Sequence, residues 1–194
     1  MERLKPIRRI IISIGHGGQK GEKFDTGAVA NGFTENEQCR QIAGYLVQEL
    51  SRSNLPVLVV PDWGLSKSID YINSIGNAYS DWAIELHKDS APYDAERMHR
   101  RCGAYFYSDD TGCAAVAKQL AEVLKTEGAH LTSWARPDTD SRFGKLGFIR
   151  NTKMLSHIIE LGFIEGDNST AENIWYAGAL AKAIVNLLNP PLVV

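Results

Sequence analysis

The stretch Ile10-Ile11-Ile12-Ser13-Ile14-Gly15-His16-Gly17-Gly18 decides the fold, because an apolar, β-branched run stops abruptly at a histidine between glycines. Such a run predicts a strand that is buried on both faces. Glycine permits backbone torsions that other residues avoid, so the chain can turn sharply and leave the imidazole at the end of the sheet. A lone histidine after a strand is more often structural than functional. His16 therefore needs partners from elsewhere in the chain.

Apolar segments alternate with segments of helical spacing along the rest of the chain. Strands are predicted at 55–60, 82–86, 103–107, 146–149 and 155–161, and helices at 35–50, 65–79, 111–126 and 171–188. The glycine-rich segment Gln19 to Asn31 and the polar segment 128–145 are predicted to be loops. This alternation predicts a single α/β domain over residues 1–194, with a mostly parallel twisted sheet of about six strands flanked by helices.

Composition excludes several classes of function. The net charge is −2 and no long basic run occurs, Arg97, Arg100 and Arg101 forming only a small cluster, so we expect no nucleic-acid partner. No apolar run is long enough to span a membrane, so no membrane insertion is expected. The three cysteines, Cys39, Cys102 and Cys113, are widely spaced, which predicts buried thiols rather than disulfides or a thiolate metal site.

A second histidine follows another predicted strand. His87 comes directly after 82–86, and the carboxyl ends of parallel strands meet at one edge of a sheet, so His16 and His87 can lie together. Glu35 falls in the first turn of a helix capped by Thr34, with Glu37 at the capping-box position. A carboxylate there is also favoured by the helix dipole alone.

Glu160 is an ionisable residue within an apolar strand, where it is costly without a partner. Two imidazoles and two carboxylates are the residues of a hydrolytic zinc site, in which three protein ligands leave a position for water and a further carboxylate takes its proton. The simpler alternative is that Glu160 pairs with a buried cation such as an arginine.

In this order and context the motifs resemble the zinc-dependent N-acetylmuramoyl-L-alanine amidases of bacterial autolysins and phage endolysins. The matching segments are Gly15-His16-Gly17-Gly18, Asp25-Thr26-Gly27-Ala28, Gly32 with Glu35, Leu86-His87 with Ser90-Ala91, and Ile158 to Ile164 around Glu160. The resemblance implies that His16, Glu35 and His87 bind one Zn²⁺ per chain and that Glu160 is the catalytic residue. It also implies peptidoglycan as the substrate, cleaved between N-acetylmuramic acid and the L-alanine of the stem peptide.

Two departures from the family pattern concern substrate contacts rather than ligands. The loop from His16 to Asp25 is longer than usual, and Asp89 stands where an asparagine is common. Asp89 either alters the accepted peptide or glycan or simply caps its loop. His130 either lines the cleft or is incidental, whereas His99 is expected in solvent and His157 on the strand face opposite Glu160.

Two other functions stay open, a zinc exopeptidase of similar fold and a non-catalytic domain that binds the cell wall. We expect a monomer that acts on the cell wall. The start of the chain, Met1 to Pro6, has no apolar segment typical of a secretory signal, so the protein is expected to be cytoplasmic until released, or to be part of a longer protein. A phage-type lysin fits this better than a secreted autolysin.

Overall fold

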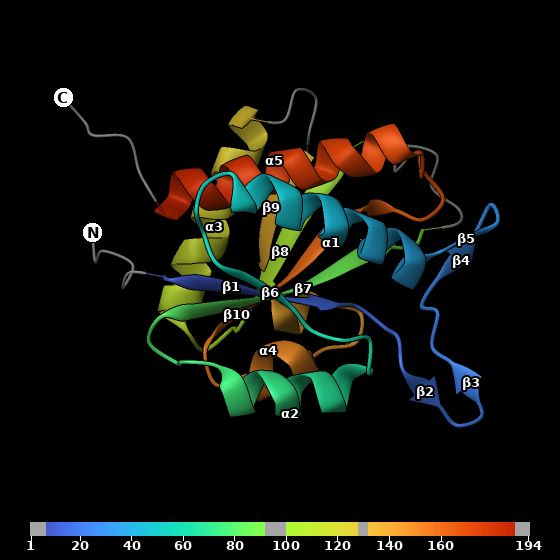
Figure 1. The fold of residues 1–194 in the computed structure, drawn as a ribbon, viewed down its shortest axis with the longest axis horizontal. Helices are drawn as coiled ribbons and strands as arrows, with labels where there is room; N and C mark the ends of the chain where they lie inside the picture. Colours follow the sequence, from blue (N-terminus) through green and yellow to red (C-terminus); the bar gives the residue numbers. More distant parts are fainter. Residues whose placement is uncertain (1–6, 92–99, 128–131, 189–194) are drawn as a thin grey trace.

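A six-stranded sheet runs through the centre of the computed structural model, which describes residues 7–91, 100–127 and 132–188 (Figure 1). The strand order is β6-β1-β7-β10-β8-β9. Neighbouring strands are parallel, except that β8 runs antiparallel to β10. The strands are β1 (Arg9–Ile14), β6 (Val57–Val59), β7 (Asp81–Asp89), β8 (Arg101–Phe106), β9 (Thr132–Pro137) and β10 (Leu155–Phe163). The predicted α/β class and the mostly parallel sheet are confirmed.

Helices cover both faces of the sheet. One face carries α1 (Glu35–Ser51), α3 (Thr111–Glu127) and α5 (Thr170–Leu188), and the other carries α2 (Leu65–Ile75) and the short α4 (Gly147–Asn151) (Figure 1). Alternate residues of β1 supply the two cores: Ile10 and Ile12 pack toward α1 and α5, while Ile11 packs toward α2 and α4. All three are fully buried, as the apolar run predicted.

Three very short strands lie in the segment predicted as a glycine-rich loop, and a fourth follows shortly after it. They pair as two small hairpins, β2 (Gln19–Lys20) with β3 (Lys23–Phe24) and β4 (Val29–Ala30) with β5 (Phe33–Thr34). Figure 1 shows both hairpins beyond the carboxyl end of β1, on the side where α1 begins. The long loop therefore covers the edge of the sheet where His16 lies.

Two predicted elements are wrong. Residues 147–149 begin α4, with Leu146 as its N-cap, instead of forming a strand with it, and the predicted loop 128–145 contains the strand β9 and a 3-10 turn, η2 (Asp138–Asp140). A run of four apolar residues suits a short helix as well as a strand, and here Phe148 and Ile149 bury one helical face. β9 is an edge strand without regular alternation of buried and exposed residues, so it gave no periodic signal.

The strands β7 and β10 run further than predicted. His87 lies two residues before the end of β7 instead of following it, and Glu160 lies three residues before the end of β10. The pairing of β10 with β7 becomes irregular between Glu160 and Phe163. Gly162 takes a φ of 77° there, and a Cβ would lie 2.5 Å from the Tyr176 hydroxyl, so glycine is needed. This irregularity ends the regular ladder directly beside Glu160.

Some predictions fall on residues outside the described part of the chain, namely those for Arg97, His99 and His130. The three cysteines are free and buried, as expected. Among the described helices, none has the length and apolar character needed to cross a membrane.

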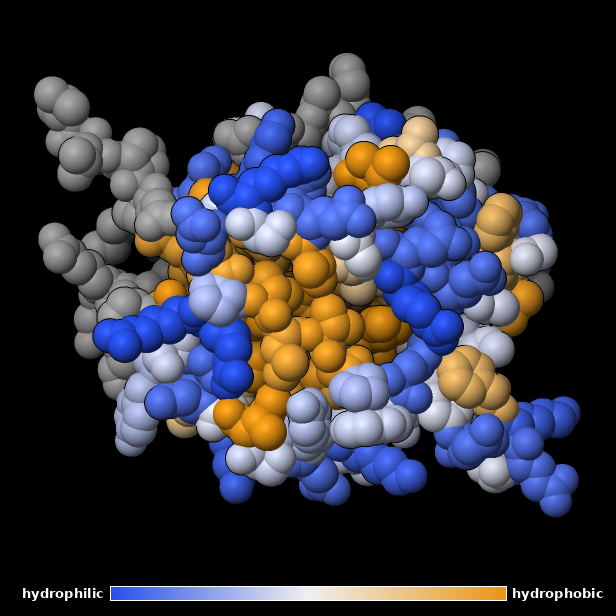
Figure 2. Space-filling model, viewed as in Figure 1, coloured by the Kyte–Doolittle hydropathy of each residue, from blue (hydrophilic) through white to orange (hydrophobic). Residues whose placement is uncertain are grey.

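Figure 2 shows an apolar area over the edge strand β6, bordered by polar side chains. This strand is only three residues long.

A buried ion pair fixes η2 and α4 beneath the sheet. The carboxylate of Asp138 is fully buried and accepts two hydrogen bonds from Arg150, together with the backbone amides of Ser108 and Leu146. Burial opposes ionisation, but the Arg150 and backbone hydrogen bonds outweigh it and lower the pKa of Asp138. The ionised carboxylate therefore organises this corner of the fold.

We predict that Asp138→Asn lowers the free energy of unfolding by about 2–3 kcal/mol at pH 7. This is below the ~3–5 kcal/mol for breaking a fully buried pair because Arg150 is partly exposed. Because folding lowers this pKa, the stabilisation is present above the unfolded value of 3.8 and is lost as the pH falls below it. Chemical denaturation at pH 7 and pH 3 checks both statements.

Asp109→Asn is the matched control, since that side chain is 70% exposed and lies 4.0 Å from Arg150. Its effect should stay within about 0.5 kcal/mol. Equal losses in the two variants, or a loss in Asp138→Asn that is as large at pH 3 as at pH 7, would contradict the assignment.

Candidate active site

The structure brings His16, Glu35 and His87 together at the carboxyl ends of β1 and β7. Oε2 of Glu35 lies 3.2 Å from Nε2 of His16, and Oε1 lies 2.8 Å from Nδ1 of His87. One ligand atom from each residue lies within 4.8 Å of the others. His16 has a φ of 64°, which non-glycine residues seldom adopt and which is often found at functional sites. The three predicted metal ligands thus form one cluster.

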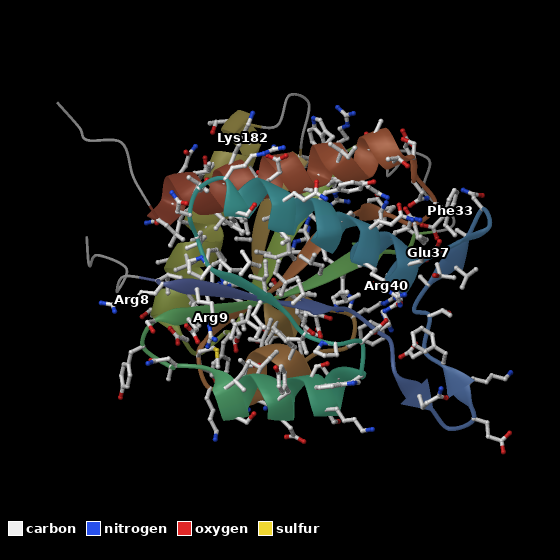
Figure 3. The ribbon with its side chains drawn as sticks, viewed as in Figure 1. Arg8, Arg9, Phe33, Glu37, Arg40 and Lys182 are labelled. Atoms are coloured by element: carbon white, nitrogen blue, oxygen red, sulfur yellow. The ribbon has the colours of Figure 1, made fainter. Side chains whose placement is uncertain are left out.

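The first turn of α1 is anchored from several sides, which fixes Glu35. Thr34 caps the helix by accepting a hydrogen bond from the Glu37 amide, as predicted. The side-chain amide of Asn36 donates to the Gly15 carbonyl at 3.3 Å, linking the helix to the end of β1. Arg40 donates to Asn36 and pairs with Asp62, and Figure 3 shows it projecting from the same end of α1 as Glu37.

Backbone amides also hold the Glu35 carboxylate. The amide of Ala28 donates to Oε2 at 3.0 Å and the amide of Lys88 donates to Oε1 at 3.2 Å. Burial disfavours the charged carboxylate, but the hydrogen bonds from His16 and His87 outweigh it, so the pKa of Glu35 is well below its usual range. Glu35 is therefore an ionised carboxylate with a fixed orientation.

Each imidazole has a second carboxylate on its other nitrogen. Nδ1 of His16 lies 3.2 Å from Asp25, and Nε2 of His87 lies 3.1 Å from Glu85. In a metal complex, Nδ1 of His16 and Nε2 of His87 would donate their protons to these carboxylates, which would leave the lone pairs of Nε2 of His16 and Nδ1 of His87 for the metal. Metal-binding histidines are commonly oriented in this way.

The donor set fits a zinc ion. Zinc favours imidazole nitrogen and carboxylate oxygen at about 2.0–2.2 Å, which in tetrahedral geometry separates ligand atoms by about 3.3 Å. The separations of 3.2 Å and 2.8 Å from Glu35 to the imidazoles of His16 and His87 are close to this value. Two imidazoles and one carboxylate also leave a fourth position for water or substrate.

Glu85 is a site residue that the sequence prediction missed. It is buried within β7, two residues before His87, and therefore lies on the same face of the strand. The sequence did contain a signal for Glu85, because a carboxylate inside an apolar strand is costly without a partner. The same argument singled out Glu160. Asp25 was part of a matching motif, but its hydrogen bond to His16 depends on how the long loop folds and was not predicted.

Glu160 lies beside the cluster on the neighbouring strand, since it is paired with His87 in the register of β10 and β7. Its Oε2 is buried without a hydrogen-bond partner. No ion pair involves Glu160 among the residues that the structure describes, so the alternative of a buried arginine partner is not observed. Burial raises the pKa of Glu160 to about 8, and Asp89 and Glu35 add to the rise against the opposing effect of His87 and His16.

His157 lies on the opposite face of β10, as predicted. It accepts a hydrogen bond from Trp82 and donates one to the Cys113 carbonyl, each at 2.9 Å. Burial lowers the pKa of His157 to about 4, so the ring is neutral in the core. This histidine is structural.

Asp89 was predicted either to contact the substrate or to cap its loop, and its surroundings are compatible with both roles. Its carboxylate accepts a hydrogen bond from the Ser90 amide at 2.8 Å, which is a loop cap. It also lines a cavity beside Glu160. A contact with substrate stays a prediction.

Residues 10–189 match the sequence profile of the Amidase_3 family, described as N-acetylmuramoyl-L-alanine amidase. The chain belongs to this family. The predicted resemblance and the predicted class of reaction, hydrolysis of the amide that joins N-acetylmuramic acid to L-alanine in peptidoglycan, are thereby confirmed. No curated protein matches the sequence.

Solved structures of amidases share the fold. The N-acetylmuramoyl-L-alanine amidase AmiC2 of Nostoc punctiforme aligns with a TM-score of 0.71 and 16% identity, covering 93% of this chain and 97% of that one. The CwlD amidase from Clostridioides difficile, solved in complex with the GerS lipoprotein, aligns with a TM-score of 0.72 and 17% identity, covering 94% and 98%. The catalytic domain of the CD27L endolysin, which targets Clostridia difficile, aligns with a TM-score of 0.67 and 18% identity, covering 93% and 96%.

We predict that Gly27→Ala weakens zinc binding by about 10- to 100-fold, the range for changes that disturb the orientation of metal ligands. A Cβ at Gly27 would lie 2.5 Å from the His16 ring and 2.7 Å from Oε2 of Glu35, so the ligands must move. Competition with a chromophoric chelator measures the affinity.

Gly21→Ala is the matched control, because Gly21 has a φ of 67° against 68° at Gly27 but a Cβ there meets nothing within 4 Å. Both variants carry the same backbone strain, and only Gly27→Ala crowds the ligands. Unchanged zinc affinity in Gly27→Ala, or equal losses in both, would contradict the site.

Proposed function

We propose that this amidase cleaves its substrate with one zinc ion bound by His16, Glu35 and His87, and with Glu160 as the group that transfers the proton. The observation that carries the proposal is the cluster of three donors within 4.8 Å, with an unpaired carboxyl on the adjacent strand. Family membership supports peptidoglycan as the substrate.

When bound, zinc supplies Lewis acidity, polarising the amide carbonyl and lowering the pKa of its water to about 7. The protein contributes the orientation of the ligands. Glu35 is held by two backbone amides, and Asp25 and Glu85 orient the imidazoles of His16 and His87. These contacts fix the ligands before substrate arrives, which reduces the reorganisation required during the reaction.

Glu160 is suited to carry a proton from the attacking water to the departing amine. It neighbours His87 across the sheet, and no hydrogen bond of the described residues occupies its buried oxygen. A pKa raised to about 8 by burial brings it toward neutral pH, and a positive charge near His87 would lower it again. A group that titrates near the working pH can both accept and donate a proton.

Both alternative functions are less well supported. A zinc exopeptidase is disfavoured because the family cleaves a sugar–peptide amide rather than a terminal peptide bond. A non-catalytic wall-binding domain is disfavoured by the intact cluster and by the free carboxyl of Glu160. We also infer a monomer that works at the cell wall, because His16, Glu35, His87 and Glu160 all come from one chain.

We predict that Glu160→Gln keeps its zinc and its thermal midpoint but lowers the rate of peptidoglycan hydrolysis by about 10²- to 10⁴-fold, the usual contribution of a positioned acid or base. His87→Ala should instead lose zinc and activity together. Elemental analysis, thermal unfolding and release of soluble wall fragments, measured on both variants, check this. Glu122→Gln on the exposed face of α3 is the control and should match the wild type.

Mass spectrometry of the fragments identifies the bond that is cut. The proposal requires free lactyl carboxylates and free alanine amino groups. New reducing sugar ends would show a glycosidase instead. Loss of zinc in Glu160→Gln, or near-complete retention of its activity, would overturn the assigned roles.

A further inference from the structure

A cavity of about 130 Å³ adjoins Glu160 on the side away from the histidines. It lies beside the carboxyl end of β10, with Arg101 at the start of β8 and Arg136 near the end of β9. Two carboxyl groups line it, Glu160 and Asp89, and two guanidinium groups, Arg101 and Arg136. Its remaining side chains are mainly aromatic: Tyr105, Trp134 and Phe163.

Arg101, at the start of β8, has no anionic partner within the described residues. Its Nε is buried and makes no hydrogen bond, and its guanidinium lies 5.4 Å from the centre of the Phe163 ring. The neighbouring Arg100 is different, because it binds the Glu172 carboxylate through Nε and Nη2 and stacks at 4.1 Å on Trp175. Leaving the donor of a buried cation unpaired is costly, and an anionic ligand would satisfy it.

Arg136 supplies a second guanidinium from the next strand. It is paired with Tyr105 in the register of β8 and β9, and its guanidinium lies 4.9 Å from the centre of the Trp134 ring. Neither Arg136 nor Arg101 forms an ion pair with Glu160 or Asp89 among the pairs found in the described structure. Among the described residues, no carboxylate is therefore ion-paired to either guanidinium group of the cavity.

The order of the strands relates this cavity to the scissile bond. Across the sheet the order is His87 on β7, Glu160 on β10, Arg101 on β8 and Arg136 on β9. If the carbonyl of the substrate lies at the histidines and the departing amine at Glu160, the peptide attached to that amine continues toward β8 and β9. This step rests on the proposed function.

We infer that the cavity is a subsite for a free carboxylate of the stem peptide, bound by Arg101 and Arg136. Guanidinium groups bind carboxylates through paired, charge-assisted hydrogen bonds, and the aromatic side chains shield them from water. The subsite makes the enzyme selective for peptides with an acidic group close to the alanine.

The test uses two synthetic muramoyl peptides that differ in one group: the residue after alanine carries either a free carboxylate or the corresponding carboxamide. Wild type should cleave the carboxylate peptide with the higher kcat/KM. Arg101→Gln should lower kcat/KM for that peptide by about 10- to 100-fold, through KM rather than kcat, and should leave the carboxamide peptide nearly unchanged. Arg101→Lys should recover part of the loss, and Arg136→Gln should act in the same direction if Arg101→Gln folds poorly.

Arg142→Gln is the matched control, because Arg142 is exposed and also lies over an aromatic ring, that of Phe143 at 4.7 Å, but does not line the cavity. It should leave both peptides unaffected. Equal losses for both peptides in Arg101→Gln, or no loss for either, would overturn the inference.

Calorimetric titration of the two peptides separates this inference from the proposed function. If wild type cleaves neither peptide, the proposed function fails, but the carboxylate peptide should still bind more tightly than the carboxamide and lose that advantage in Arg101→Gln. Equal binding of the two peptides to wild type would overturn the subsite whatever the activity.

Discussion

The carboxylate of Glu35, shared between two imidazoles, is the interaction on which the rest of the site depends. It joins three elements that are distant in sequence, because His16 follows β1, His87 belongs to β7 and Glu35 opens α1. Glu35 is buried and the two imidazoles are half-buried, and a buried carboxylate is costly to leave without partners. The backbone amides of Ala28 and Lys88 also donate hydrogen bonds to the Glu35 carboxylate. This carboxylate therefore links the long loop and the end of β7 to the first turn of α1.

The sequence predicted this part of the molecule well because its signals are local. An apolar strand followed by Gly-His-Gly, a capped helix opening on Glu35 and a charged residue inside an apolar strand can each be recognised from a few neighbouring residues. β9 and α4 were not predicted, because an edge strand has little periodicity and a four-residue apolar run has no unique conformation. The cavity that Arg101 lines could not be predicted either, since it exists only through the antiparallel pairing of β8 with β10.

The sheet topology also assigns chemical roles to its two halves. The parallel strands β1, β7 and β10 bring His16, His87 and Glu160 to one edge, in keeping with ligand binding at the carboxyl ends of parallel strands. The reversed strands β8 and β9 lie beside Glu160, and they supply Arg101, Arg136 and two of the aromatic side chains of the cavity, Tyr105 and Trp134. In this account the parallel part performs the hydrolysis and the reversed part selects the peptide.

The central claim is that one zinc ion lies between His16, Glu35 and His87, with Glu160 outside its coordination. Diffraction data from crystals of the zinc-loaded protein, collected above and below the zinc absorption edge, test this most directly. The account predicts a single anomalous peak about 2.0–2.2 Å from Nε2 of His16, Nδ1 of His87 and an oxygen of Glu35. A peak coordinated by Glu160 or Glu85 in place of Glu35, or the absence of a peak at the cluster, would contradict it.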